Sequence, residues 1–198
     1  GFPEELCVND VNYIMKSVYN KWDSNKFFNY ADNFYLDRKS KIKTFSTGMK
    51  MKLEIAIALS HEARLLVLDE VTNGLDPSAR MEILDMLLEF IQAEDRAVLL
   101  SSHIIGDLEK ICDYITFIHK GEIIFSENKD DLLEKYAVIN ADTDRIRELD
   151  EKAVIALDKK SFSSSALVYR NLIPDSFETE KTTIEDIMLY YLKRGEKQ

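Results

Sequence analysis

The sequence predicts an α/β fold in which helices pack in layers against a parallel sheet. Two continuous apolar segments, residues 65–68 and 97–100, have the length and composition of strands that are buried on both faces of a sheet. Each segment is followed by a helical pattern of apolar residues, over 77–91 and 104–111. This alternation of strand and helix is typical of a layered α/β architecture.

The composition favours a cytosolic protein and argues against a protein whose main role is to cover nucleic acid or anionic lipid. The net charge is −10, and phosphate contacts need clustered Lys and Arg, so we expect no nucleic-acid partner. No apolar stretch approaches the roughly 20 residues that cross a bilayer, and the N-terminus lacks a signal-peptide pattern. Cys7 and Cys112 form no Cys-x-x-Cys pair, which indicates two reduced thiols.

The first 60 residues have the pattern of short helices. Apolar residues recur at helical spacing over 8–15 and again over 27–34, and Asp23 or Ser24 can cap the second helix. A basic linker follows at 38–43. Beyond it we expect a helix from Met49 to about Ser60, because this segment contains no Gly or Pro.

The last third of the chain has a different pattern of predicted strands and helices. Two predicted strands, 114–118 and 122–125, flank His119-Lys120-Gly121, which reads as a hairpin turn. The elements predicted after Asn128 are a helix at 130–136, strands at 137–141, 153–157 and 166–170, and a final helix with an apolar stripe from Ile184 to Leu192. These elements indicate a small α+β extension.

Four polar features lie where an α/β protein binds ligands. Asp69 and Glu70 follow the strand 65–68, so their carboxylates are expected at the carboxyl edge of the sheet. The loop 46–48 opens a helix, and exposed N–H groups there attract anions. A tight loop at 73–77 and an imidazole at His103 complete the set. Each feature alone also reads as a turn, a helix cap or a satisfied histidine, but the order of the four is specific.

This order resembles the ATP-binding-cassette (ABC) ATPase family across about residues 40–125. Phe45 to Met49 resembles the signature loop, which is usually Leu-Ser-Gly-Gly-Gln. Leu65 to Glu70 resembles the Walker B strand with the glutamate that follows it. Gly74 to Pro77 resembles the D-loop, and His103 resembles the switch histidine. The resemblance implies a partial P-loop NTPase-type layered sheet with an ABC helical subdomain. It divides the chain into a helical subdomain (1–60), a catalytic lobe (61–128) and a C-terminal extension (129–198).

The resemblance also implies roles for residues of the catalytic lobe. Asp69 would hold Mg²⁺ through water, Glu70 would act as general base on the attacking water, and His103 would sense the γ-phosphate. His61 and His119 are better explained by a helix end and a hairpin turn.

The signature loop is implied to act on a second subunit. In a head-to-tail dimer, Ser46, Thr47 and Gly48 would contact the ATP that the partner holds, and Asp76 would lie at the dimer interface. Thr47 replaces the first signature glycine and Met49 the glutamine, whereas the phosphate-facing Ser46 and Gly48 are retained.

The sequence lacks one motif of the family. None of its 6 glycines is followed directly by Lys, so no Gly-x-x-x-x-Gly-Lys-Ser/Thr loop cradles the α- and β-phosphates. We therefore expect an N-terminally truncated piece of an ATPase, which alone neither binds MgATP tightly nor hydrolyses it. We also expect weakened folding, with exposed strand edges beside 65–68.

The function implied is that of the ATP-binding and hydrolysing subunit of an ABC membrane transporter. The Ser-x-Gly-Met-Lys signature at 46–50 resembles bacterial drug and peptide exporters. Such a subunit would be cytoplasmic, peripheral on the inner face of the membrane, and docked on a permease. The alternatives are an ABC ATPase acting on ribosomes or chromosomes, and a regulatory cassette that binds nucleotide without turnover.

Overall fold

The computed structural model describes residues 2–159 and 164–195. These residues are 44% helix and 24% strand, which confirms the predicted α/β class. The chain forms two compact units, Gly1–Ile104 and Ile105–Gln198, which are described separately below. The three-part division at 60 and 128 stays a prediction.

The first unit begins with three helices that share one core. They are α1 (Val8–Val18), α2 (Ser24–Asn33) and α3 (Thr47–Ala58), with the 3-10 turn η1 (Ile42–Thr44) before α3. The break predicted between the first two helices is confirmed, and Asp23 caps α2 by accepting the Lys26 N–H at 2.9 Å. Helix α3 starts two residues earlier than predicted, because Ser46 caps it.

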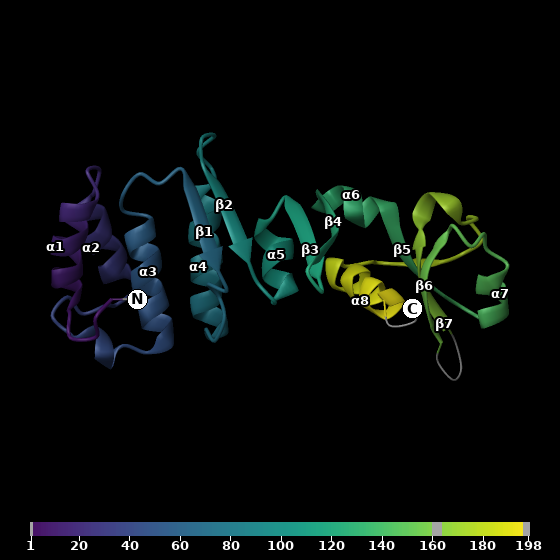
Figure 1. The fold of residues 1–198 in the computed structure, drawn as a ribbon, viewed down its shortest axis with the longest axis horizontal. Helices are drawn as coiled ribbons and strands as arrows, with labels where there is room; N and C mark the ends of the chain where they lie inside the picture. Colours follow the sequence, from purple (N-terminus) through teal and green to yellow (C-terminus); the bar gives the residue numbers. More distant parts are fainter. Residues whose placement is uncertain (1, 160–163, 196–198) are drawn as a thin grey trace. The chain divides into compact units, whose positions relative to one another are not determined.

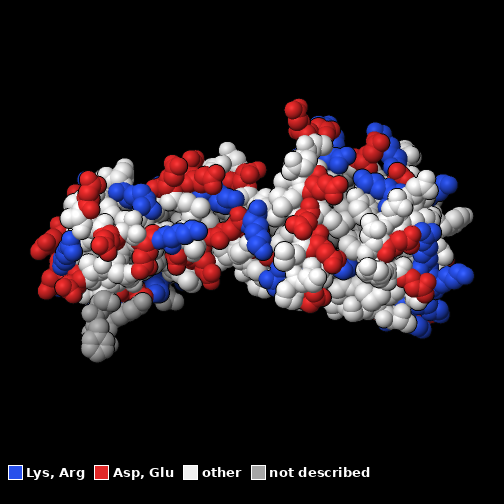
Figure 2. Space-filling view, turned by 180° about the vertical axis from the view of Figure 1, so that it is seen from behind, with Lys and Arg blue, Asp and Glu red and all other residues white. Residues whose placement is uncertain are grey.

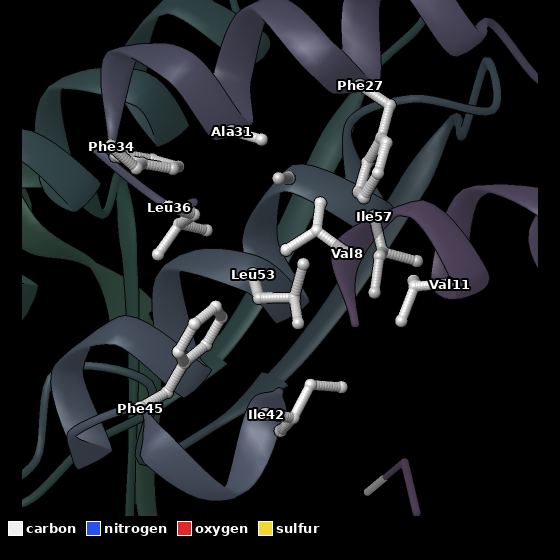
Figure 3. Packing of buried hydrophobic residues seen from close by; sticks show 11 residues of the cluster. Val8, Val11, Phe27, Ala31, Phe34, Leu36, Ile42, Phe45, Leu53 and Ile57 are labelled. Atoms are coloured by element: carbon white, nitrogen blue, oxygen red, sulfur yellow. The ribbon is translucent and has the colours of Figure 1, made fainter. Parts of the chain in front are cut away.

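The core of these helices is apolar and closely packed. Figure 3 shows Phe27 of α2 and Leu53 of α3 pointing into the same space as Val8 and Val11 of α1. Phe45, which immediately precedes the loop 46–48, is also buried in this cluster. The buried Phe45 side chain therefore fixes the start of α3 against the core of the three helices.

The rest of the first unit is a strand–helix–strand segment. It contains β1 (Leu65–Asp69), α4 (Pro77–Phe90) and β2 (Ala97–Ser101), with the two strands side by side (Figure 1). The strands pair in parallel from Leu65↔Ala97 to Asp69↔Ser101, as the α/β pattern predicted. Their carboxyl ends therefore meet at one edge.

The predicted burial of these strands on both faces is wrong. Leu66 is only 4% exposed, but Leu65, Val67 and Leu99 on the opposite face are 55%, 68% and 62% exposed. The reason is that β1 and β2 form a two-stranded sheet, and within the described residues one of its faces has no covering layer.

The second unit combines a hairpin, a four-stranded sheet and several helices. Its elements are α5 (Ile105–Ile111), β3 (Tyr114–His119), β4 (Glu122–Asn128), α6 (Lys129–Lys135), β5 (Tyr136–Ala141), α7 (Thr143–Arg147), β6 (Val154–Lys159), β7 (Ser164–Tyr169), η2 (Arg170–Leu172), β8 (Thr179–Glu180) and α8 (Ile184–Gly195). The sheet has the order β6-β7-β5-β8 and is antiparallel. The α+β character predicted for this region is therefore observed.

Two apolar clusters form the core of the second unit. Alternate residues of β5 and β7 belong to different clusters: Val138 and Leu167 to one, Ile139 and Val168 to the other. The first cluster includes Ile184 of α8, so the final helix packs on the sheet as its apolar stripe predicted. The sheet is thus buried on both faces, unlike β1 and β2.

The hairpin turn agrees with the sequence pattern. Lys120 and Gly121 have φ of 50° and 82°, the left-handed values that a tight two-residue hairpin turn requires.

No helix of the described residues is long and apolar enough to span a bilayer. On the face that Figure 2 shows, acidic and basic side chains are interspersed.

The uneven burial of β1 predicts unequal effects of two neighbouring truncations. Leu66→Ala should lower the free energy of unfolding by about 2–5 kcal/mol, because it opens a cavity at a buried site. Val67→Ala should cost less than about 1 kcal/mol, because this side chain lies largely in solvent. Urea denaturation followed by circular dichroism measures both. Equal losses would contradict the exposed face of β1.

Candidate functional site

The carboxyl edge of β1 and β2 places Asp69 directly opposite Ser101. The two residues are partners in the parallel register, and the Ser101 hydroxyl donates a hydrogen bond to Asp69 Oδ1. Both side chains are exposed. The hydrogen bond holds one carboxylate oxygen and leaves the other free to accept from water or a ligand.

Glu70 turns the chain sharply at the end of β1. Its φ is 52°, a left-handed conformation that costs a non-glycine residue about 1–3 kcal/mol. Its N–H donates to the Ser101 carbonyl at 3.0 Å and lies 3.3 Å from the Ser101 hydroxyl, while its carbonyl accepts from Asn73 N–H at 3.0 Å. These bonds hold the strained turn in place.

His103 meets Glu70 at that edge. The imidazole Nδ1 lies 2.5 Å from Glu70 Oε2, and the two side chains are 61% and 38% exposed. An ionised carboxylate can only accept, so Nδ1 carries the proton in this contact, and Nε2 remains available to a ligand. The structure therefore brings together Asp69, Glu70 and His103, three of the predicted site residues.

The loop 46–48 is built as a helix N-terminus. The Ser46 hydroxyl oxygen accepts the Met49 N–H at 3.2 Å, which leaves its own hydrogen free to donate outward. Thr47 is exposed in the first turn, and Gly48 follows it. A Cβ on Gly48 would lie 3.4 Å from Leu75 Cδ2, so the loop is packed closely against the 73–77 segment.

Asp76 caps the helix that follows the 73–77 loop. Its carboxylate accepts the N–H groups of Ser78 and Ala79, both at 3.0 Å. These bonds, above all the one from Ala79, hold the pKa of Asp76 below its usual range. The neighbouring Leu75 side chain is buried, which helps to fix the position of the 73–77 loop.

The predicted site residues thus fall into two groups. Asp69, Glu70 and His103 form one group, and Ser46, Thr47 and Gly48 lie with the Asp76 loop in the other. Ser101 was not predicted as a site residue, although it touches both acids of the first group. Its position at the end of β2, opposite Asp69, is the sequence signal that identifies it once the two strands are aligned.

The donor set suits a magnesium ion whose other ligands are water and phosphate. The described residues contain no group of three His, Cys, Asp or Glu side chains that could enclose a metal. Mg²⁺ in phosphoryl-transfer sites commonly has one or two carboxylates, waters and the phosphates as ligands. The single exposed carboxylate of Asp69, oriented by Ser101, fits that requirement.

The chain matches known proteins in both sequence and fold. A family model described as "AAA domain, putative AbiEii toxin, Type IV TA system" matches residues 3–106. The chain is 42% identical over 91 residues to the Uncharacterized ABC transporter ATP-binding protein YhcH of Bacillus subtilis, covering 46% of this chain and 30% of the relative. It is 42% identical over 92 residues to the Lantibiotic transport ATP-binding protein SrtF of Streptococcus pyogenes, covering 46% of this chain and 40% of the relative.

A solved structure described as an ATP binding subunit of an ABC transporter has a similar fold. The TM-score is 0.59 at 28% sequence identity, over 67% of this chain and 57% of that chain. The chain spans 30% of the length of the first curated relative named above and 40% of the length of the second.

The cap at Asp76 predicts a pH-dependent contribution to stability. A pKa lowered by folding stabilises the native state above the unfolded pKa of about 3.9, and that stabilisation is lost as the pH falls through the folded pKa. Asp76→Ala should therefore lower the urea midpoint at pH 7, and the difference from the unmodified chain should shrink at pH 3. Asp76→Asn is the matched control, since an amide oxygen still caps. An Ala effect that stays constant with pH would contradict this role.

Proposed function

This chain belongs to the AAA-domain family whose model it matches, and we propose that, like the ABC transporter ATP-binding proteins to which it is similar, it supplies the residues that hydrolyse ATP in a membrane transporter. The observation that carries the proposal is the contact between Glu70 and His103 at the carboxyl edge of β1 and β2, next to Asp69. A base, an imidazole and a metal-binding carboxylate there suit phosphoryl transfer to water.

Each residue of this edge has a distinct proposed role. Glu70 accepts a proton from the attacking water, and its carboxylate is positioned by its strained backbone. His103 donates from Nε2 toward the terminal phosphate while Nδ1–H donates to Glu70, a pair of bonds that requires a hydrogen on both ring nitrogens. Asp69 would hold Mg²⁺, which would supply positive charge to offset that of the phosphates.

The second group of residues is proposed to act on a partner subunit. The Ser46 hydroxyl and the Gly48 N–H lie at the N-terminus of α3, where backbone N–H groups and the helix dipole favour an anion. In a head-to-tail dimer they contact the γ-phosphate that the partner holds, and Thr47 lines the same turn. Asp76, the N-cap residue of the following helix α4, would lie at the subunit interface of such a dimer.

A transporter is favoured over the other ABC functions. The relatives named above are ABC transporter and lantibiotic transport ATP-binding proteins, which supports a role with a permease at the cytoplasmic face of a membrane. The Ser-x-Gly-Met-Lys signature of residues 46–50 supports an exporter of peptides or drugs. Glu70 beside His103 supports turnover and argues against a cassette that only binds nucleotide.

The first test is ATP turnover in the native complex, isolated through a tag on this chain. Glu70→Gln should lower kcat by about 100-fold or more, because it removes the general base while leaving the shape of the site. His103→Ala should also lower kcat. The matched control is His119→Ala at the hairpin end, which should leave turnover unchanged. Full turnover in the Glu70→Gln complex would refute the proposed role.

A second test concerns the 198 residues in isolation. They contain no Gly-x-x-x-x-Gly-Lys-Ser/Thr loop, so the purified 198-residue chain should show background ATP hydrolysis and weak binding of MgATP. Phosphate release and equilibrium dialysis with labelled ATP measure these quantities. Turnover above background that Glu70→Gln abolishes would show that these residues hold the phosphates in another way.

A further inference from the structure

We propose that Ser101 is a positioning residue for ATP hydrolysis, an inference that rests on the proposed function. Its hydroxyl lies between the two acidic residues of the sheet edge: it donates to Asp69 Oδ1 and lies 3.3 Å from the Glu70 N–H. Ser101 therefore sets the orientation of the metal-binding carboxylate and the backbone turn of the general base together.

The chemistry of a hydroxyl suits this double role. A serine hydroxyl has one hydrogen to donate and two lone pairs that accept. The ionised Asp69 carboxylate can only accept, so it takes the hydrogen, and a lone pair is left facing the Glu70 N–H. Alanine has neither group, whereas threonine supplies both and is favoured in strands.

The strand register explains why this position carries the role. Ser101 is the last residue of β2 and pairs with Asp69, the last residue of β1. Its carbonyl also accepts the Glu70 N–H at 3.0 Å, so Glu70 meets both the backbone and the side chain of one residue. Loss of the hydroxyl leaves the carbonyl bond in place, which means that the sheet can form without it.

Ser101 also begins the short loop that carries the imidazole. His103 follows it by two residues, and between them the Ser102 hydroxyl accepts the Ile104 N–H at 3.0 Å, which shapes the loop. Glu70 is thereby held at both ends, by Ser101 at its backbone and by His103 at its carboxylate.

The experiment compares Ser101→Ala and Ser101→Thr, with Ser126→Ala as the matched control. Ser126 is another exposed strand serine whose hydroxyl contacts a side chain, that of Thr116 at 2.8 Å. The first readout needs no nucleotide: NMR couplings between Hα and Hβ of Asp69 in the 198-residue chain report its χ1 rotamer. We expect one rotamer in the unmodified chain, in Ser101→Thr and in Ser126→Ala, and rotamer averaging in Ser101→Ala.

The second readout is the Mg²⁺ concentration that gives half-maximal ATP turnover in the native complex. Ser101→Ala should raise it, or lower kcat, by about 10- to 100-fold, the usual cost of losing a group that orients a metal-binding residue. Ser101→Thr should restore both values to within a few-fold of the unmodified complex.

The outcomes separate this inference from the proposed function. A single Asp69 rotamer and unchanged Mg²⁺ dependence in Ser101→Ala would overturn the role of Ser101, even where Glu70→Gln abolishes turnover. Failure of Ser101→Thr to restore either readout would also overturn it, because the hydroxyl would not be the feature that matters. An unmodified complex without ATP turnover would instead refute the proposed function, and the NMR readout would still decide the positioning of Asp69.

Discussion

The parallel register of β1 and β2 is the constraint on which the candidate site depends. It places Asp69 opposite Ser101 and so brings together the carboxyl ends of two strands that lie about thirty residues apart in sequence. A shift by one residue would turn each side chain to the other face of the sheet. Glu70 and His103 follow directly from these strand ends, so their contact is a consequence of the same pairing.

Stability alone does not explain the residues at this edge. The Glu70–His103 pair is largely exposed, and such pairs contribute about 0–1 kcal/mol. The left-handed backbone of Glu70 costs about 1–3 kcal/mol, which is at least as much. A turn that gains little stability from its own contacts is more easily understood as a means of directing a carboxylate toward a ligand.

Local sequence rules predicted the features that depend on neighbouring residues. The cap at Asp23 and the hairpin turn at Lys120 and Gly121 follow from side-chain and backbone preferences, and both are present. The parallel pairing of the two apolar strands was also predicted from their pattern. The cap and the turn require only a few residues of context, whereas the parallel pairing follows from the strand–helix–strand order of the segment.

Features that depend on distant residues were predicted less well. Leu65, Val67 and Leu99 have a fully apolar pattern but lie on an exposed face, because burial depends on what covers a sheet and not on the strand itself. The short elements α7 and β8 have too few residues for a periodic signal. Ser101 was missed because a serine at a strand end is common, and its contacts with Asp69 and Glu70 appear only when two strands are placed in register.

The position of the terminal phosphate tests the central claim most directly. The measurement is a structure of the native complex, isolated through this chain and trapped with MgATP by Glu70→Gln. The account predicts that the γ-phosphate lies within hydrogen-bond distance of His103 Nε2, with Mg²⁺ near Asp69 and the Ser46 hydroxyl of a second subunit on the opposite side. A γ-phosphate bound away from the carboxyl edge of β1 and β2 would contradict the account.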